Sequence, residues 1–344
     1  MNSIATTPRN HSGADTPDAS ATSIKFAIET AVVTGGTSGI GRELVNLLAS
    51  QLGSAVVTCG RNQDAVAALN GNSSNVSATA IDLTERREHF ASHEVDANPL
   101  LMVCNNAGFE FGRIAARQLG TIKLLVLNAG VSGLNPAEDL RARKGAASLA
   151  NDWRTSALGT YLACEEALAK AGGTVVFIST PLVHQRQHME NGLPSQIEPY
   201  VHMKESIANG LWRLYTRANG PLSGAEGPKV KLMFLEPGSV DTEMHQETLH
   251  SDSALASRTL KLREEGRLRD PAIVARIIMR MGAENVVFNH EVLTTGATQP
   301  APAYVDAGRP QKWVHAITDE AYRFEQANLH RPPMDRWWFE SEVA

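Results

Sequence analysis

Short apolar segments alternate with longer amphipathic segments from about Thr30 onward. The apolar segments are typical of buried β-strands, which we expect at 31–33, 54–58, 76–81, 123–127, 174–178, 230–235 and 291–294. Between them, apolar residues recur at helical spacing, most clearly at 41–52, 153–171 and 200–217. Strands that alternate with helices predict an α/β fold, a doubly wound parallel sheet of about seven strands with helices on both faces. Ligands of such sheets bind at the carboxyl ends of the strands.

The two ends of the chain differ in composition from the middle. Residues 1–24 are rich in Ser, Thr, Asn, Asp and Pro, so we expect a disordered N-terminal tail rather than a signal peptide. A central domain spans 25–298. Residues 299–344 combine prolines with aromatic residues, including Trp337, Trp338 and Phe339. Because these rings in solvent would leave a sizeable apolar patch, we expect this C-terminal arm to pack on the body or on a partner subunit.

Charge, hydropathy and cysteine content narrow the class of protein. The 344 residues carry a formal net charge of −5 without a long basic run, which argues against nucleic acid or an anionic membrane as the main partner. No apolar stretch approaches the roughly 18 residues that span a bilayer. The three cysteines, Cys59, Cys104 and Cys164, contain no CxxC pair. We therefore expect no disulfide framework, no metal site and a reducing, cytoplasmic location.

A glycine-rich segment follows the first expected strand and opens the first expected helix. It reads Thr34-Gly35-Gly36-Thr37-Ser38-Gly39-Ile40-Gly41. Glycines let the backbone turn tightly and let a phosphate approach, while the helix N-terminus presents unpaired N–H groups to the anion. The spacing differs by one residue from the common GxGxxG fingerprint, and an ordinary strand-to-helix turn is the alternative. The segment predicts a dinucleotide site.

Tyr200 and Lys204 stand four residues apart, which places them on one face of an expected helix. A phenol has an unperturbed pKa near 10 and is a poor general base at neutral pH. A cation about 4 Å away, at an effective dielectric of ~20, contributes about 4 kcal/mol, or roughly 3 pKa units. We therefore expect Lys204 to bring the pKa of Tyr200 toward the operating pH, where acid–base catalysis works best. In isolation, a surface Tyr and Lys at helical spacing would be the simpler interpretation.

Taken together, the motifs resemble the short-chain dehydrogenase/reductase family. Thr-Gly-x-x-x-Gly-Ile-Gly, Asn-Ala-Gly, Tyr-x-x-x-Lys and Pro-Gly follow in that order over about 30–298. The resemblance implies a Rossmann-like fold, a nicotinamide cofactor and interconversion of a carbonyl and an alcohol on a small, apolar substrate. It also implies a homodimer or homotetramer that needs no metal. Tyr200 would be the acid–base group, and Lys204 would also hold the nicotinamide ribose.

The end of the second strand bears on the choice of cofactor. An acidic residue there would accept hydrogen bonds from the adenosine ribose and repel a 2′-phosphate, but the chain has Gly60 and Arg61 instead. Gly60 leaves space, and Arg61 offers a planar donor fork suited to phosphate, so we expect NADP(H). A solvated surface arginine is the alternative. By resemblance, the cofactor contacts comprise Thr34, Gly35, Thr37, Ser38, Gly39, Ile40, Gly41, Asp82, Leu83, Asn128, Ala129, Gly130, Pro237, Gly238, Val240 and Thr242, besides Arg61, Tyr200 and Lys204.

The tripeptide Asn-Ala-Gly occurs twice, at 106–108 and at 128–130. The first copy follows Cys104-Asn105 and has the letters more usual in the family. The second follows a strongly apolar strand and lies about fifty residues before Ser179-Thr180, close to the family spacing. We assign the family role to Asn128 and interpret the residues around Asn105 as an insertion.

A hydroxyl at the end of the fifth strand would hold the substrate oxygen. The family's Ile-Ser-Ser aligns its catalytic serine with Thr180, but Ser179 stays open because the segment up to Tyr200 is some eight residues longer than usual. Both side chains donate hydrogen bonds. Ser156 stands where the family has an asparagine that sustains a water-linked proton relay. A hydroxyl lacks the donor and acceptor geometry of an amide, which leaves the relay and the redox activity open.

Two other functions therefore stay open. A non-redox isomerase, dehydratase or cyclase on the same scaffold would use Tyr200 as acid–base, and Ser156 and the long 181–199 segment leave room for it. A nucleotide-binding regulatory protein without turnover is the second, although the intact Tyr200–Lys204 pair argues against it. His184 and His188 lack a third metal ligand, so we expect them to line the substrate mouth or face solvent.

Overall fold

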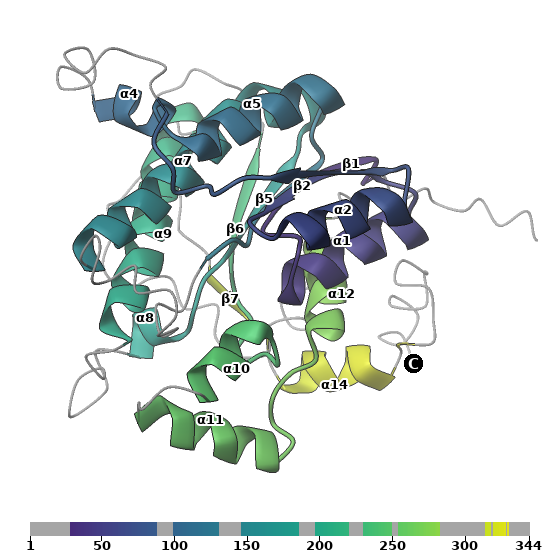
Figure 1. Ribbon diagram of the computed structural model, residues 1–344, viewed down its shortest axis with the longest axis vertical. Helices are drawn as coiled ribbons and strands as arrows, with labels where there is room; N and C mark the ends of the chain where they lie inside the picture. The colour runs from purple at the N-terminus through teal and green to yellow at the C-terminus, as the bar shows by residue number, and fades with distance from the viewer. Residues whose placement is uncertain are drawn as a thin grey trace, which may run out of the picture.

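Seven short strands pair side by side in one parallel sheet (Figure 1). The computed structural model describes residues 28–87, 99–130, 146–185, 197–219, 230–249, 254–282, 314–317, 319–327 and 329. Within them the strand order is β3-β2-β1-β4-β5-β6-β7. The strands are β1 (Thr30–Thr34), β2 (Ala55–Gly60), β3 (Val76–Ala80), β4 (Leu124–Leu127), β5 (Thr174–Ile178), β6 (Lys231–Glu236) and β7 (Val314–Ala316). The expected α/β class with a doubly wound parallel sheet is confirmed.

Six strands lie within two residues of the expected segments. They were predictable because most of their residues are apolar or β-branched. Every residue of β4 and β5 is buried, as befits the middle of a sheet that is covered on both faces. The expected strand at 291–294 lies outside the described residues. The seventh strand is β7, which falls within the range that we predicted as the C-terminal arm and pairs with β6.

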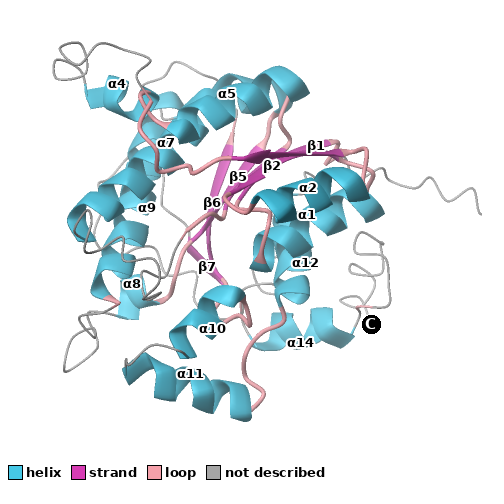
Figure 2. Ribbon diagram, viewed as in Figure 1, coloured by secondary structure: helices cyan, strands magenta, loops and turns pink. Residues whose placement is uncertain are grey.

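Helices cover both faces of the sheet (Figure 2). One face carries α5 (Ala107–Leu119), α7 (Ala146–Ala171) and α9 (Glu198–Asn219), and α4 (Pro99–Cys104) packs on α7. The other face carries α1 (Gly39–Gln51), α2 (Gln63–Asn72), α12 (Pro271–Gly282) and α14 (Asp319–Ala327). The helices α8 (Leu182–Gln185), α10 (Glu243–Leu249) and α11 (Ala254–Glu264) follow the carboxyl ends of β5 and β6.

Two apolar clusters, one on each face, form the core. Leu44 and Leu48 of α1 pack with Ile278 of α12 on one side, and Tyr161 of α7 packs with Phe177 of β5 on the other. All five side chains are almost fully buried. Alternate residues of each strand thus serve opposite clusters, which fixes the register of the sheet.

The C-terminal helix α14 is held on α12 by buried charges. Glu325 is fully buried and pairs with Arg276, whose Nε lies 3.1 Å from Oε2, and also with Arg280. Tyr322 adds a hydrogen bond from the backbone N–H of Asp270 to its hydroxyl oxygen, at 2.6 Å. The segment 314–327 is therefore part of the sheet and its helical layer. None of the helices among the described residues is long and apolar enough to cross a bilayer.

Candidate active site

The glycine-rich turn lies between β1 and α1 and is closed by contacts that only glycine allows. Gly35 has φ +69°, and a Cβ on it would lie 3.0 Å from the Cα of Ala129. A Cβ on Gly41 would lie 2.3 Å from the carbonyl oxygen of Gly35. Ser38 is the N-cap of α1, yet within the described chain its side chain makes no capping hydrogen bond. The first N–H groups of α1 therefore have no side-chain partner from Ser38. They lie at the carboxyl end of β1, where they would stabilise a bound anion.

Asn128, from the second Asn-Ala-Gly copy, ties the end of β4 to this turn. Its amide nitrogen Nδ2 donates to the carbonyl oxygens of Thr34 and Gly35, each at 3.2 Å. The backbone N–H groups of Asn128 and Ala129 both donate to Oγ1 of Thr34, at 3.0 Å. The structure places this copy at the carboxyl edge of the sheet, and Asn128, Ala129 and Gly130 all line the cleft described below.

Asn106, from the first copy, begins a helix instead. It is the N-cap of α5, and its Oδ1 accepts a hydrogen bond of 2.6 Å from the N–H of Gly108. A Cβ on Gly108 would lie 2.4 Å from the carbonyl oxygen of Ser156, so this glycine lets α5 cross closely over α7. Thr160 reinforces the crossing with a hydrogen bond of 3.0 Å to the Gly108 carbonyl. The repeated tripeptide therefore serves helix capping and helix packing here.

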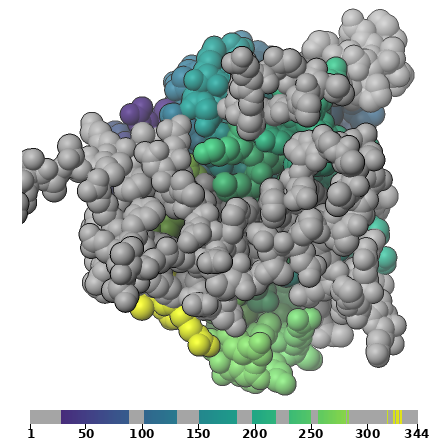
Figure 3. Space-filling view, turned by 180° about the vertical axis from the view of Figure 1, so that it is seen from behind, coloured from purple at the N-terminus to yellow at the C-terminus, as the bar shows by residue number. Residues whose placement is uncertain are grey.

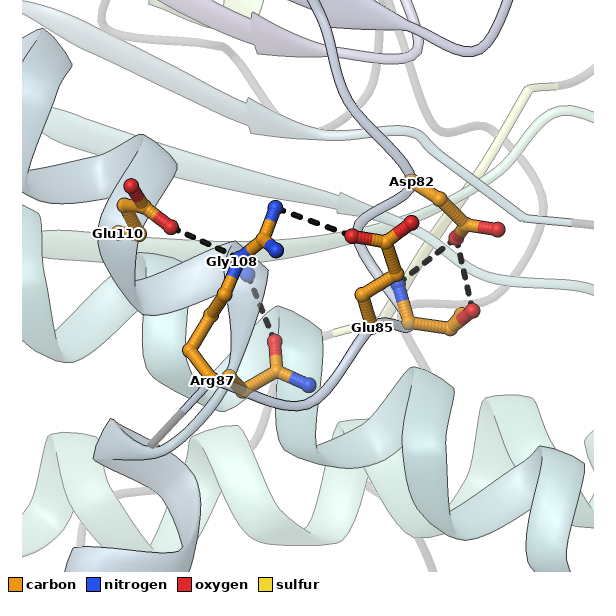
Figure 4. A network of polar contacts seen from close by, with 7 residues as sticks. Asp82, Glu85, Arg87, Gly108 and Glu110 are labelled. Atoms are coloured by element: carbon orange, nitrogen blue, oxygen red, sulfur yellow. Dashed lines mark hydrogen bonds and ion pairs between the residues drawn. The ribbon is translucent and has the colours of Figure 1, made fainter. Parts of the chain in front are cut away.

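Figure 4 shows the polar network beside that cap. Arg87 bridges Glu85 and Glu110 at 3.0 and 2.9 Å. The carboxylate of Asp82, which the resemblance places at the adenine, accepts two hydrogen bonds from Thr84, at 2.9 Å from its N–H and 2.7 Å from its hydroxyl. Leu83 lines the cleft, whereas Asp82 is not among the lining residues. The Asp82 carboxylate thus closes a local turn.

Tyr200 and Lys204 project from α9 toward the end of β5. Lys204 is 2% exposed, and its Nζ donates a hydrogen bond of 2.8 Å to the carbonyl oxygen of Ile178. The same Nζ lies 5.7 Å from the centroid of the Tyr200 ring. Ser179 and Thr180 follow Ile178 directly, are buried, and line the same cleft as the pair. The hydrogen bond from Lys204 to the last residue of β5 thus brings a phenol, an ammonium and two hydroxyls together at the end of that strand.

Burial changes the acidity of both groups. It raises the pKa of Tyr200 to about 12 and lowers the pKa of Lys204 to about 8. In each case removal from water disfavours the charged form. The direction for Tyr200 is opposite to the one expected from the sequence, because desolvation of the phenolate outweighs an ammonium that lies over the ring and is hydrogen-bonded to Ile178. At neutral pH the phenol is protonated and suited to donate a proton.

Ser156 lies away from this group. It is buried on the α5 side of α7, its backbone oxygen accepts a hydrogen bond of 3.0 Å from Thr160, and it is not among the residues that line the cleft. One helical turn earlier, Trp153 lines the cleft and is 7% exposed, and its indole N–H has no partner among the described residues. No motif in the sequence marks Trp153 as a residue of the cleft.

At the end of β2, a close contact with Thr37 leaves no room for an acidic side chain at position 60. A Cβ on Gly60 would lie 2.1 Å from Oγ1 of Thr37, so no side chain fits there. Arg61 follows at the exposed rim and lines the cleft together with Thr37 and Asn62. The side chain of Asn62 is used to cap α2.

The loop after β6 closes the cleft from the other side. Gly39 lies against Thr242, and a Cβ on it would lie 3.1 Å from the threonine Cγ2. Arg269, which sequence reasoning missed, donates from Nη1 to the carbonyl oxygens of Pro237 at 2.9 Å and Ile317 at 2.6 Å. Gly238 and Val240 lie within the loop that Arg269 anchors and line the cleft. Arg269 therefore couples the loop after β6 to the end of β7.

These parts surround one open cleft of about 1380 Å³ along the carboxyl ends of the strands. That exceeds the roughly 300–1,000 Å³ of a pocket for one small ligand, so a dinucleotide and a substrate fit together. Helix N–H groups, glycines without Cβ atoms and an exposed arginine suit the phosphates of a dinucleotide. The described residues contain no cluster of side chains that could hold a metal ion. His188 and the side chain of His184 lie outside the described residues.

Comparisons with known proteins bear on the fold of the chain. A family model described as short chain dehydrogenase matches residues 29–116. Among solved structures, the KRED1-Pglu enzyme is similar with a TM-score of 0.54 and 20% identity, over 74% of this chain and 94% of that chain. A short chain dehydrogenase/reductase from Saccharomyces cerevisiae is similar with a TM-score of 0.53 and 22% identity, over 74% and 90%.

A third similar structure is a 3-ketoacyl-(acyl-carrier-protein) reductase from Brucella melitensis complexed with NADH. Its TM-score is 0.52 and its identity 15%, over 74% of this chain and 91% of that chain. At such identities the likeness concerns the fold. Among curated proteins, none matches the sequence significantly.

Proposed function

We propose, from the membership of this chain in the short-chain dehydrogenase/reductase family, that it is an NADP(H)-dependent oxidoreductase that interconverts a carbonyl and an alcohol. The observation that carries the proposal is the meeting of Tyr200, Lys204 and the hydroxyls of Ser179 and Thr180 in the cleft that the glycine-rich turn opens. A family fold alone does not give an activity, whereas an acid, a cation and a hydrogen-bond donor around one space do.

The roles of the residues follow from their chemistry. When bound, the nicotinamide cofactor supplies or accepts the hydride. Thr180 or Ser179 donates a hydrogen bond to the substrate oxygen and holds it near the phenol of Tyr200. In reduction, Tyr200 donates its proton to that oxygen while the carbonyl carbon gains the hydride. Lys204 stabilises the negative charge that then develops on the phenolic oxygen.

Tyr200 enters carbonyl reduction in its protonated form. With a pKa of about 12, it carries its proton throughout the neutral range. Proton donation leaves a phenolate, which burial disfavours, so stabilisation of that charge by Lys204 is part of the proposed mechanism.

The preference for NADP(H) is supported by the β2 end. Thr37 excludes any side chain at Gly60, including a carboxylate that would repel a 2′-phosphate. Arg61 stands next to it with a guanidinium fork that matches phosphate geometry.

The test is consumption of the reduced cofactor, followed by absorbance with a panel of ketones and aldehydes. We expect turnover with NADPH and a kcat/KM that is lower with NADH. A better kcat/KM with NADH contradicts the cofactor assignment. Tight NADPH binding without turnover of any carbonyl contradicts the redox assignment and favours a non-redox reaction on the same scaffold.

A further inference from the structure

The cleft is far more basic than the chain that forms it. Among the described residues that line it, seven are Arg or Lys and one, Glu243, is acidic. The whole chain has 32 Lys and Arg against 37 Asp and Glu. A cleft lined by charges of one sign concentrates the field and raises the local concentration of oppositely charged ligands. The segregation of charge therefore points to anionic ligands.

Four of the seven cations already have a role in the site. Lys204 is bonded to the Ile178 carbonyl, and Arg269 is bonded to the carbonyls of Pro237 and Ile317. Arg42 lies 3.5 Å from carboxylate oxygens of Glu43 and Glu243, and Arg61 stands at the end of β2. The other three are Arg258, Arg267 and Arg323.

These three arginines come from two parts of the chain, α11 with the connection that follows it and α14, which lie at one end of the molecule (Figure 1). Arg258 lies on α11, Arg267 in the connection to α12, and Arg323 on α14. Figure 1 shows the connection between α11 and α12 passing beside α14, and in Figure 3 light green atoms lie next to yellow ones. All three residues line the same cleft as Tyr200.

The strands that lead to these arginines end away from β2. The path from β2, beside Arg61, to β6, which leads into α10 and α11, crosses four strand spacings. At about 4.8 Å each, this amounts to roughly 19 Å between the strand ends. Helix α14 follows β7, one strand further. The segment after β6 also reaches back to α1, where Glu243 lies 3.5 Å from Arg42, so the NADPH measurement below decides whether Arg258 and Arg323 serve the cofactor.

The side chains are available to a ligand. Arg258 and Arg323 are exposed, and neither has a hydrogen-bond or ion-pair partner among the residues that the structure describes. Arg267 pairs with Glu265 at 3.1 Å, but the arginine side chain is 68% exposed, and such surface pairs contribute little. The helix that presents Arg323 is fixed, because its Glu325 is buried between Arg276 and Arg280.

We propose that the substrate carries an anionic group, a phosphate or a carboxylate, at the end remote from its carbonyl, and that Arg258 and Arg323 bind this group. Arg267 at the rim adds long-range attraction. The proposal rests on the proposed carbonyl–alcohol function and names the substrate class for it. A guanidinium fork matches phosphate and carboxylate oxygens in a bidentate manner, whereas a neutral substrate would leave three cations facing an open cleft.

The test compares carbonyl substrates in matched pairs with NADPH. Acetoacetyl-CoA is paired with the neutral thioester S-acetoacetyl-N-acetylcysteamine, and levulinate with methyl levulinate, so that the reacting ketone is the same within a pair. We expect the anionic member to have a kcat/KM at least about 10-fold higher, and the ratio to fall toward one in Arg258→Ala/Arg323→Ala. Arg113→Ala, an exposed arginine of α5 that does not line the cleft, should keep the wild-type ratio.

A binding measurement separates this proposal from the proposed function. Pyrophosphate and CoA should each raise the melting temperature of the NADP-loaded wild type, and the double variant should lose this shift while its Kd for NADPH stays within a few fold. The first probe tests a phosphate site alone, and the levulinate pair above tests a carboxylate. A shift without turnover of any pair supports the anion site and contradicts the carbonyl–alcohol function.

Three results would overturn the anion site. One is a wild-type preference for the neutral members, and another is a preference that survives in the double variant. The third is a double variant whose main defect is weaker NADPH binding, since the arginines would then serve the cofactor.

Discussion

The two sides of the cleft are built in different ways. On the cofactor side, the glycine-rich turn, Asn128 and Lys204 are bonded to backbone atoms of neighbouring strands. On the arginine side, defined by Arg258, Arg267 and Arg323, exposed side chains project from segments that follow β6 and β7. The first side has short sequence motifs because close backbone packing tolerates few residues. The second has none, because many exposed residues could occupy the same helical surface.

The largest effect on stability should come from weakening the attachment of α14, which carries Arg323, to the rest of the protein. Glu325→Gln leaves Arg276 and Arg280 buried without a counter-charge, so the free energy of unfolding should fall by about 3–5 kcal/mol in chemical denaturation. Any loss of NADPH affinity in the protein that remains folded should come through Tyr322 of α14, whose ring centroid lies 5.5 Å from the guanidinium carbon of Arg269, the anchor of the loop after β6.

Gln326→Ala, on the exposed side of the same helix, is the control and should change stability little. Unchanged stability in Glu325→Gln would mean that the buried pairs do not hold α14 in place.

On the cofactor side, Lys204→Met should also have a large effect. At 5.7 Å and an effective dielectric of ~20, the ammonium contributes about 3 kcal/mol to an anion on the Tyr200 ring, so kcat should fall roughly 100-fold. NADPH affinity should fall as well, since the family role of the lysine includes the ribose.

The pH profile provides the check on that charge. The folded-state pKa of Lys204 is about 8, below its ordinary value, so the side chain is charged below pH 8 and neutral above it. The rate of carbonyl reduction should therefore be level below pH 8 and decline above it, while Tyr200 stays protonated until about pH 12. In Lys204→Met the decline should be absent. A wild-type rate that rises from pH 8 to 9 would contradict the assignment.

Arg61→Ala removes an exposed arginine from the cofactor side and tests whether that residue binds the 2′-phosphate of NADPH. Loss of a hydrogen bond to a charged group costs about 1.5–3 kcal/mol, so kcat/KM with NADPH should fall roughly 10- to 150-fold. The value with NADH should change little, because NADH has no 2′-phosphate. Equal losses with both cofactors would show that Arg61 serves another part of the site.

The smallest effect should come from the two Asn-Ala-Gly copies. Asn106→Ala removes the cap of α5 and should cost about 1 kcal/mol of stability with the activity retained. Asn128→Ala removes the bonds to Thr34 and Gly35 and should lower activity more than Asn106→Ala does. Melting temperature and steady-state rate measure the two, and the reverse ranking in activity would exchange their roles.

The sequence predicted the sheet well wherever strands are long and apolar. β4 and β5 were readily predicted as strands, because both are short apolar segments in which every residue is buried. β7 was not predicted because three residues, Val-His-Ala, show no usable periodicity, and its identity depends on pairing with β6. α7 begins at Ala146, seven residues before the expected start, because the apolar pattern does not mark the end of a helix.

Within the site, the sequence motifs predicted which residues lie together better than they predicted the pKa values of those residues. Tyr200, Lys204, Ser179 and Thr180 meet as the resemblance implied. The pKa of Tyr200 could not be predicted from a spacing of four residues, because burial and the orientation of the ammonium decide it. Residues without a motif, such as Trp153, Arg258 and Arg269, became visible only when distant segments were brought together.

The most direct test of the central claim is the rate of carbonyl reduction by Tyr200→Phe, measured together with its Kd for NADPH. The substitution removes only the phenolic oxygen from a partly buried ring that packs against the apolar core and lines the cleft. Loss of a general acid should lower the rate about 10²- to 10⁴-fold. The affinity for NADPH should stay within a few fold of the wild type. A variant that binds NADPH normally and reduces the carbonyl at a near wild-type rate would contradict the assignment of Tyr200 as the proton donor.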